Sequence, residues 1–327
     1  MRFLTSFIQN GLIIFLLISP QKLWAQTTVP YVNLWSIFGQ FPVEIQREVK
    51  GGKAGANGMV SHNQPNYLGA EYQRGGMDTL LAGIILRDTS LIDEGFRVAN
   101  ITFMKQMAGG GFGDKAPTGA AFWVTACARS FLALKESEYW PEYQTQTENY
   151  YSALGLASTF LVNNVDKLIA HDKGTPNRLL IDADALFLTA KLLGADPPSE
   201  ADKLRDLGLA LFDKDSGAFQ ENEGGDSSYQ AVNLQMLMYY VTYYPSSDID
   251  SIIQQGLDWE LSKVNADGEI DVKGNSRTGV GKEVYFGKEK EVNTREVCLM
   301  FAYAGALYHN DNYTNTAVLI HQNRKKK

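Results

Sequence analysis

Residues 217–240, GAFQENEGGDSSYQAVNLQMLMYY, include polar side chains whose types and spacing suit acid–base chemistry. Asp226 and Tyr229 are three residues apart, so at the start of a helix they would lie on the same side of it. The phenol could then transfer a proton, and the carboxylate could orient the phenol or cap the helix. We therefore expect Asp226 and Tyr229 to be catalytic and Glu223 and Gln230 to bind substrate.

Two histidines lie in segments that we expect to be loops leading into buried helices. One is in VSHNQPNYLGAEYQRGG and the other is in AHDKGTPNR. Histidine changes its charge near neutral pH and is a common acid or base, although a loop histidine can equally be a hydrogen-bonded surface residue. These segments supply the expected catalytic residues His62, His171 and Asn177 and the expected substrate-binding residues Asn63, Arg74 and Arg178.

Acidic residues of the same loops allow a second chemistry, hydrolysis by a pair of carboxyl groups. Glu221, Glu223 and Asp226 could fill those roles, with Asp114 of GGGFGD as a partner across the site. The alternative is an acidic loop that is simply solvated. Two further loops complete the expected substrate-binding set with Phe112 and Asp114 of GGGFGD and with Asn275 and Arg277 of GNSRTG.

The N-terminus predicts export. Residues 1–26 contain Arg2, an apolar run over residues 11–18 and a small residue, Ala25, which is typical of a signal peptide. We expect cleavage there and a single domain over residues 27–327, located in the periplasm or outside the cell. The apolar run is short for a membrane span, and no later segment is long and apolar enough.

Charge and cysteine content limit the classes of partner. Without Arg2 and Lys22 the chain has 28 basic and 37 acidic residues, a net charge of −9, which argues against a general nucleic-acid binder. Two cysteines do not form a disulfide framework. We expect no cofactor. The acidic turn at residues 213–217 resembles only the start of a calcium loop, so Ca²⁺ stays a weak alternative.

Helices of two kinds alternate along the chain. Five segments are apolar around most of their circumference and are therefore expected to be buried on several sides; they span residues 68–88, 118–137, 176–194, 228–245 and 295–309. Between them, residues 90–107, 199–213 and 248–264 have a single apolar stripe. The links that lead into the buried helices are the long, polar ones, and several contain short β-like phrases.

This alternation predicts an all-α fold in which buried helices form an inner ring and amphipathic helices an outer one. We expect an (α/α)5–6 toroid, incomplete or closed, with a helix over residues 32–49 helping to close the ring and short β-like loops at one mouth. An open α-solenoid is the alternative. In either fold the polar loops meet at one end, where sites are usually found.

The phrases PNRLLIDADAL, GGDSSYQAVNLQML and DGEIDVKGNSRTG, together with the helix alternation and the export signal, resemble the toroid domains of bacterial carbohydrate-active proteins. The heparinase II/III-type and alginate or glucuronan lyases are the most similar. The resemblance implies a polysaccharide or oligosaccharide ligand and β-elimination on a uronate-containing glycan, with Asn, His, Tyr and Arg side chains at the site. A glycoside hydrolase and a non-catalytic glycan-binding toroid are the alternatives.

Overall fold

The computed structural model describes residues 32–61, 69–114, 116–222, 224–285 and 287–326. Within these residues the chain is mostly α-helical with a few two-residue strands, which confirms the all-α prediction. The predicted signal peptide at residues 1–26 lies outside the described residues. None of the described helices combines the length and the hydrophobicity that a membrane span needs.

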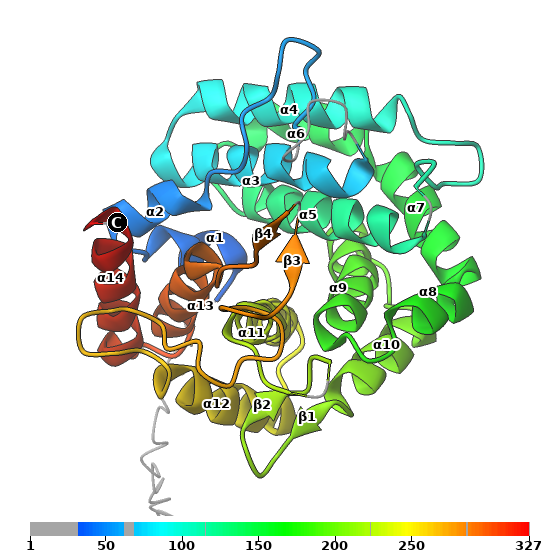
Figure 1. The fold of residues 1–327 in the computed structure, drawn as a ribbon. Helices are drawn as coiled ribbons and strands as arrows, with labels where there is room; N and C mark the ends of the chain where they lie inside the picture. The colour runs from blue at the N-terminus through cyan, green and yellow to red at the C-terminus, as the bar shows by residue number, and fades with distance from the viewer. Residues whose placement is uncertain (1–31, 62–68, 115, 223, 286, 327) are drawn as a thin grey trace, which may run out of the picture. The chain divides into compact units, whose positions relative to one another are not determined.

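Five long helices make up the interior, and each contacts the next one in the sequence. We call them the inner helices; they are α3 (Ala70–Leu86), α5 (Thr118–Lys135), α9 (Pro176–Leu193), α11 (Ser227–Tyr243) and α13 (Thr294–Leu307). Figure 1 shows them around a common centre in chain order. They correspond to the five segments that the sequence predicts to be buried.

Outer helices pack against the inner ones. α4 (Thr89–Phe103) contacts α3, α10 (Ser199–Leu209) contacts α9, α12 (Ser247–Leu261) contacts α11, and α14 (Asp311–Lys326) contacts α13. The long connection from α5 to α9 forms α6 (Trp140–Glu148), α7 (Tyr151–Asn163) and α8 (Val165–Asp172). The α3–α4 contact is close because Gly76 faces Val98; a Cβ at Gly76 would lie 2.5 Å from Val98 Cγ1.

The N-terminal segment of the described region bridges the first and last inner helices. It forms three short elements, α1 (Leu34–Gly39), α2 (Val43–Gln46) and the 3₁₀ helix η1 (Arg47–Val49), which contact both α3 and α13. The sequence predicted one helix over residues 32–49. The break has a local cause: Pro42 cannot continue a helix that begins at Leu34, and it stands instead directly before α2.

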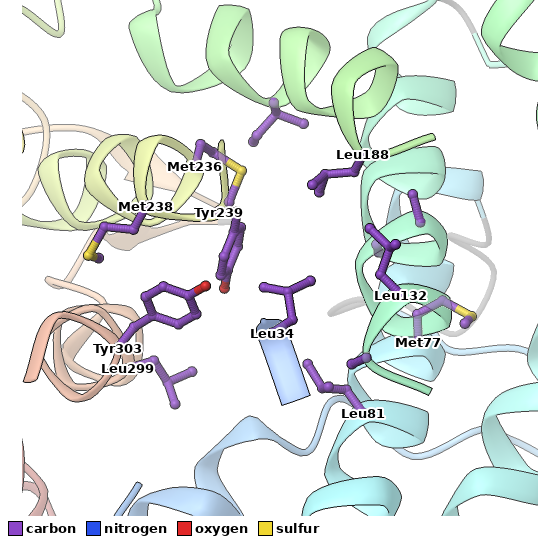
Figure 2. Close-up of a cluster of buried hydrophobic side chains, with 14 of the residues drawn as sticks. Leu34, Met77, Leu81, Leu132, Leu188, Met236, Met238, Tyr239, Leu299 and Tyr303 are labelled. Atoms are coloured by element: carbon purple, nitrogen blue, oxygen red, sulfur yellow. The ribbon is translucent and has the colours of Figure 1, made fainter. Parts of the chain in front are cut away.

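Buried side chains fill the centre below the polar loops. In Figure 2, Leu34 of α1 lies among side chains that converge from the inner helices, including Leu132, Leu188, Tyr239 and Tyr303. Leu34 is fully buried and Tyr303 is 1% exposed. Burial of this apolar surface, at roughly 25 cal/mol per Å², is what holds the inner helices together.

The structure contains two short antiparallel hairpins among the described residues, and only the first includes a β-like phrase of the sequence, SGAFQE; DGEIDV forms an isolated bridge between Ile270 and Val264, and GGGFGD forms no strand. β1 (Phe212–Asp213) pairs with β2 (Ala218–Phe219), and β3 (Val284–Tyr285) pairs with β4 (Lys288–Glu289). Both hairpins belong to connections that lead into inner helices, α11 and α13. They therefore lie at the end of the molecule where those helices begin, and Figure 1 shows β3 and β4 over the centre.

Candidate functional site

A cavity of about 1180 Å³ opens at the N-terminal ends of the inner helices. Its wall comes from every inner helix, from the β3–β4 hairpin and from residues 49–52 and 60–61. Charged, aromatic and apolar side chains alternate along this wall. A volume of this size, with a mixed apolar and polar lining, is typical of a small-molecule or oligomer site.

Tyr229 is the phenol on the rim of the cavity, in the first turn of α11. Its hydroxyl contacts the Lys290 ammonium, and the Arg277 guanidinium lies 4.2 Å from the centre of its ring. Burial raises the pKa of Tyr229, while Lys290 and Arg277 act in the opposite direction. The phenol is therefore neutral near pH 7, and the two cations would stabilise a transient phenolate.

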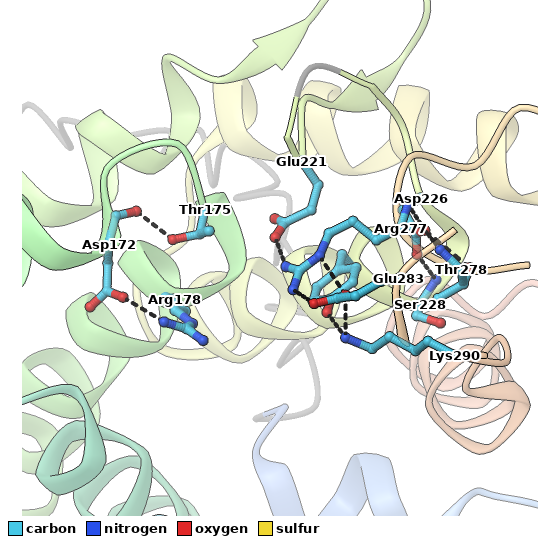
Figure 3. A network of polar contacts seen from close by, with 11 residues as sticks. Asp172, Thr175, Arg178, Glu221, Asp226, Ser228, Arg277, Thr278, Glu283 and Lys290 are labelled. Carbon is cyan, nitrogen blue, oxygen red and sulfur yellow. Dashed lines mark hydrogen bonds and ion pairs between the residues drawn. The ribbon is translucent and has the colours of Figure 1, made fainter. Parts of the chain in front are cut away.

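Arg277 links the two loops that surround Tyr229. Its Nη1 donates to Glu221 Oε1 at 2.5 Å, and its Nε and Nη2 donate to the two oxygens of Glu283 at 3.1 and 3.0 Å. Figure 3 shows this fork together with Lys290, which also binds Glu283 at 2.9 Å. Because both carboxylates already neutralise Arg277, its main role here is to hold the loops and the phenol in place.

Glu221 is fully buried behind Arg277. Burial raises the pKa of Glu221 to about 7 even though the guanidinium favours the ionised form. The positive charge of Arg178 on α9 also lowers that pKa. In the described structure Glu221 does not line the cavity, so it has no access to a ligand there.

Asp226 is a structural carboxylate. Its Oδ1 accepts from the Ser228 N–H and caps α11, and its Oδ2 accepts from the N–H groups of Arg277 and Thr278 and from the Thr278 hydroxyl. It is 1% exposed and does not line the cavity in the described structure. Of the two roles that the sequence left open for Asp226, the capping role is the one seen.

A second polar cluster lies at the start of α9. Asp172 is fully buried; its Oδ1 binds His171 Nδ1 at 2.8 Å and Arg178 Nη1 at 3.3 Å, and its Oδ2 accepts from the Thr118 hydroxyl. A proton on Nδ1 facing Asp172 leaves Nε2 of His171 as an acceptor. His171 exposes 44% of its side chain. It therefore has the geometry of an oriented base beside the cavity wall that Arg178 forms.

Arg74, Asn177 and Arg178 line the cavity with hydrogen-bonding capacity to spare. Arg74 lies 4.6 Å from the centre of the Phe122 ring, and no described carboxylate forms an ion pair with it. Asn177 is 7% exposed, and its Oδ1 has no hydrogen-bond partner among the described residues. Arg178 uses one nitrogen on Asp172. These groups could bind a ligand that carries a carboxylate and hydroxyls.

The floor of the cavity has its own polar groups, which come from positions further along α3, α5 and α11 and from the first turn of α13. Arg129 of α5 pairs with Asp78 of α3, and Tyr239 of α11 donates to Gln235 Oε1 at 3.1 Å. Gln235 in turn donates to the carboxylate of Glu296 on α13 at 3.3 Å. Burial raises the pKa of Tyr239 to about 12, so this phenol remains neutral.

The structure brings some of the predicted site residues to the cavity and not others. Arg74, Asn177, Arg178, Tyr229 and Arg277 line it; His171 does not, but it shares Asp172 with Arg178, which does. His62, Asn63 and Glu223 lie outside the described residues. The remaining predicted site residues do not line the cavity in the described structure; they are Phe112, Asp114, Asp226, Gln230 and Asn275.

Each of these remaining residues has a local partner. Gln230 donates to the carbonyl of Gly217, Asn275 donates to Thr278, and Asp114 accepts from the Ala70 N–H at the start of α3. Phe112 packs edge-on against Phe103. The acidic turn that suggested calcium is the β1–β2 turn, and no group of three or more His, Cys, Asp or Glu among the described residues is arranged to hold a metal.

Several residues that line the cavity were not predicted from the sequence. Lys290 belongs to a run of alternating charges, KEKE, in which no single lysine stands out. Asp78 and Arg129 offered a readable signal, because each is a charged residue in the interior of a helix that is apolar around most of its circumference.

No family model, curated protein or solved structure matches this chain.

Proposed function

We propose that this chain is an exported α/α toroid that binds an acidic glycan in its central cavity and cleaves it by β-elimination at a uronate residue. The contacts between helices support the toroid. The inner helices follow one another around a centre, the outer helices pack behind them, and α1, α2 and η1 join α13 to α3. Toroids of this kind place their loops at one mouth, where the cavity opens.

The observation that carries the proposal is the protonation state of Tyr229 together with the two cations beside it. A neutral phenol on the cavity wall, held by an ammonium and covered by a guanidinium, can donate its proton and be stabilised as the anion that remains. Elimination needs such a donor at the leaving glycosidic oxygen. It also needs a base for the proton on the carbon next to the carboxylate.

The neighbouring groups fit the other steps. Arg74, Arg178 and Asn177 would bind the substrate carboxylate and lower its charge, which makes the adjacent carbon acid stronger. His171, with Nδ1 held by Asp172, would take that proton. The C–H bond and the C–O bond to the leaving sugar break, a ring double bond forms, and Tyr229 protonates the leaving oxygen.

Hydrolysis by the loop carboxylates is less favoured by the geometry. Among the described residues, Glu221, Asp226 and His171 all lie outside the cavity lining, but Glu221 and Asp226 are buried and bonded to Arg277, whereas His171 exposes 44% of its side chain. A general acid and a base must both reach the glycosidic bond. A non-catalytic glycan-binding toroid fits the same cavity and would differ only in forming no product.

Products decide between these functions. The purified chain should be incubated with alginate, glucuronan and glycosaminoglycans, and product formation followed by ultraviolet absorbance. We expect an absorbing unsaturated end on at least one uronate glycan. Saturated reducing ends without absorbance would replace elimination by hydrolysis. Binding without any product would make the chain a glycan-binding protein, and neither binding nor product would overturn the proposed function.

A further inference from the structure

The cavity is deep and is closed at its far end. Its lining on α11 runs from Tyr229 at the rim to Tyr239 at the floor. Ten residues of α-helix rise about 15 Å, so the floor lies about that far below the rim. The depth exceeds what a site for a ligand lying across the mouth would need.

Aromatic side chains seal the floor. Phe38 of α1 lines the bottom of the cavity, and its ring lies 5.2 Å from that of Phe41, 5.4 Å from that of Tyr303 and 6.2 Å from that of Tyr239. All four side chains are 3% exposed or less. In Figure 2, Leu34 of the same helix lies beside Tyr239 and Tyr303. A chain that enters from the mouth therefore cannot pass through.

The sealed end is nevertheless polar. Asp78, Arg129, Gln235, Tyr239 and Glu296 come from four different inner helices and meet where an apolar core would otherwise continue. Arg129 Nε is buried without a partner among the described residues, although its Nη2 pairs with Asp78. Buried polar groups destabilise a fold unless they are hydrogen-bonded, and Arg129 Nε is the atom of this set left with a bond that a ligand could complete.

We propose that the cavity receives a glycan end-on and that these floor residues bind its terminal sugar. This inference rests on the proposed function in taking the ligand to be a glycan, and its product length also rests on cleavage at Tyr229. Hydroxyl groups of a terminal sugar can both donate and accept, so they suit a floor with a phenol, an amide, carboxylates and a guanidinium. With the end bound at the floor and Tyr229 at the rim, cleavage releases a short oligosaccharide of one length.

The number of binding sites per glycan chain tests end-on entry without relying on catalysis. The Tyr229→Phe variant should be titrated by calorimetry with a uronate glycan in size-fractionated lengths, from short oligosaccharides to polymer. We expect one site per chain at every length. A number of sites that grows with chain length would overturn end-on binding while leaving the proposed function intact. No binding at any length would overturn both.

A pair of tyrosines tests the floor itself. Tyr239→Phe removes a hydroxyl that lines the cavity, whereas Tyr303→Phe removes one from the neighbouring ring, which is bonded to Thr242. Loss of one hydrogen bond predicts about 5–10-fold weaker binding of a short oligosaccharide for Tyr239→Phe. The Tyr303→Phe protein should bind as the unaltered chain does. Equal affinities for the two variants would show that the floor does not bind the sugar.

Discussion

The two ends of the inner helices each contain a buried carboxyl group with a raised pKa, yet the two groups have different surroundings. At the mouth, Glu221 has a pKa of about 7 and binds Arg277. At the far end, Glu136 also has a pKa of about 7, but its hydrogen-bond donors are neutral: the Tyr243 hydroxyl at 2.7 Å and the backbone N–H groups of Trp35, at 3.5 Å, and Leu34. Burial is the largest cause of both shifts.

The comparison shows that a perturbed pKa alone does not locate a site. Glu136 joins α1 to α5 and α11, so its role is to hold the N-terminal segment against the far end of the inner helices. Glu221 holds Arg277, which covers a phenol on a cavity wall. The difference is the cavity: Tyr229 lines it and Tyr243 does not in the described structure, although Tyr243 too has a cation, Lys191, 5.3 Å from its ring centre.

The largest expected effect is a loss of activity on removing the tyrosine hydroxyl at the mouth but not the one at the far end. Tyr229→Phe should lower the elimination rate by roughly 10²–10⁴-fold, because it removes the proton donor, and should change the free energy of unfolding by about 1 kcal/mol or less. Tyr243→Phe should keep the activity and lose about 1–2 kcal/mol of stability, because Glu136 loses its main donor. Kinetics and urea unfolding of both variants provide the test; full activity in Tyr229→Phe would remove the phenol from the mechanism.

Removing the cation at the mouth should cost stability in a pH-dependent way. Arg277→Met leaves Glu221 buried without its partner, and we expect a loss of about 2–4 kcal/mol at pH 8. With the guanidinium gone the folded-state pKa of Glu221 rises further, so at pH 5 this carboxyl is protonated and the loss is smaller. Urea unfolding at both pH values checks this. Arg87→Met, which breaks the exposed pair with Glu138, is the control and should cost about 1 kcal/mol or less.

Asp226→Asn should destabilise by about 1–3 kcal/mol, because an amide can accept through only one of the two oxygen positions that Asp226 uses. Asp88 caps α4 through Oδ1 alone, so Asp88→Asn is a matched control that should change little. Thermal unfolding of the two variants measures the difference. Equal melting temperatures would mean that the contacts to Thr278 and Arg277 contribute nothing.

The smallest effect is a gain in stability at the far end. Glu136 has a folded-state pKa near 7 and an ordinary value near 4.5 in the unfolded chain, so its burial costs stability increasingly as pH rises through this window. Glu136→Gln removes that cost and can still bond to Tyr243, so we expect about 1–3 kcal/mol more stability at pH 8 and little change at pH 4. A pH-independent effect in chemical unfolding would show that Glu136 does not titrate in this range.

The sequence predicts the helices well and the site only in part. Apolar periodicity identifies α3, α5, α9, α11 and α13, because the spacing of apolar residues along each segment indicates that the helix is buried. The Asp226 cap is also a local signal. The pairs that shape the site join distant positions: Arg277 with Glu221, Lys290 with Tyr229, and Arg129 with Asp78. Local patterns do not specify which charge of one loop meets which charge of another, so those contacts become visible only in the folded chain.

The origin of the oxygen atoms in the products tests the central claim most directly. A uronate glycan should be cleaved in heavy-oxygen water and the products weighed by mass spectrometry. Elimination breaks the C–O bond without adding water, so we predict an unsaturated product with no label, lighter than the hydrolytic product by one water molecule. Incorporation of one labelled oxygen per cleaved bond would contradict elimination and assign the cavity to a hydrolase.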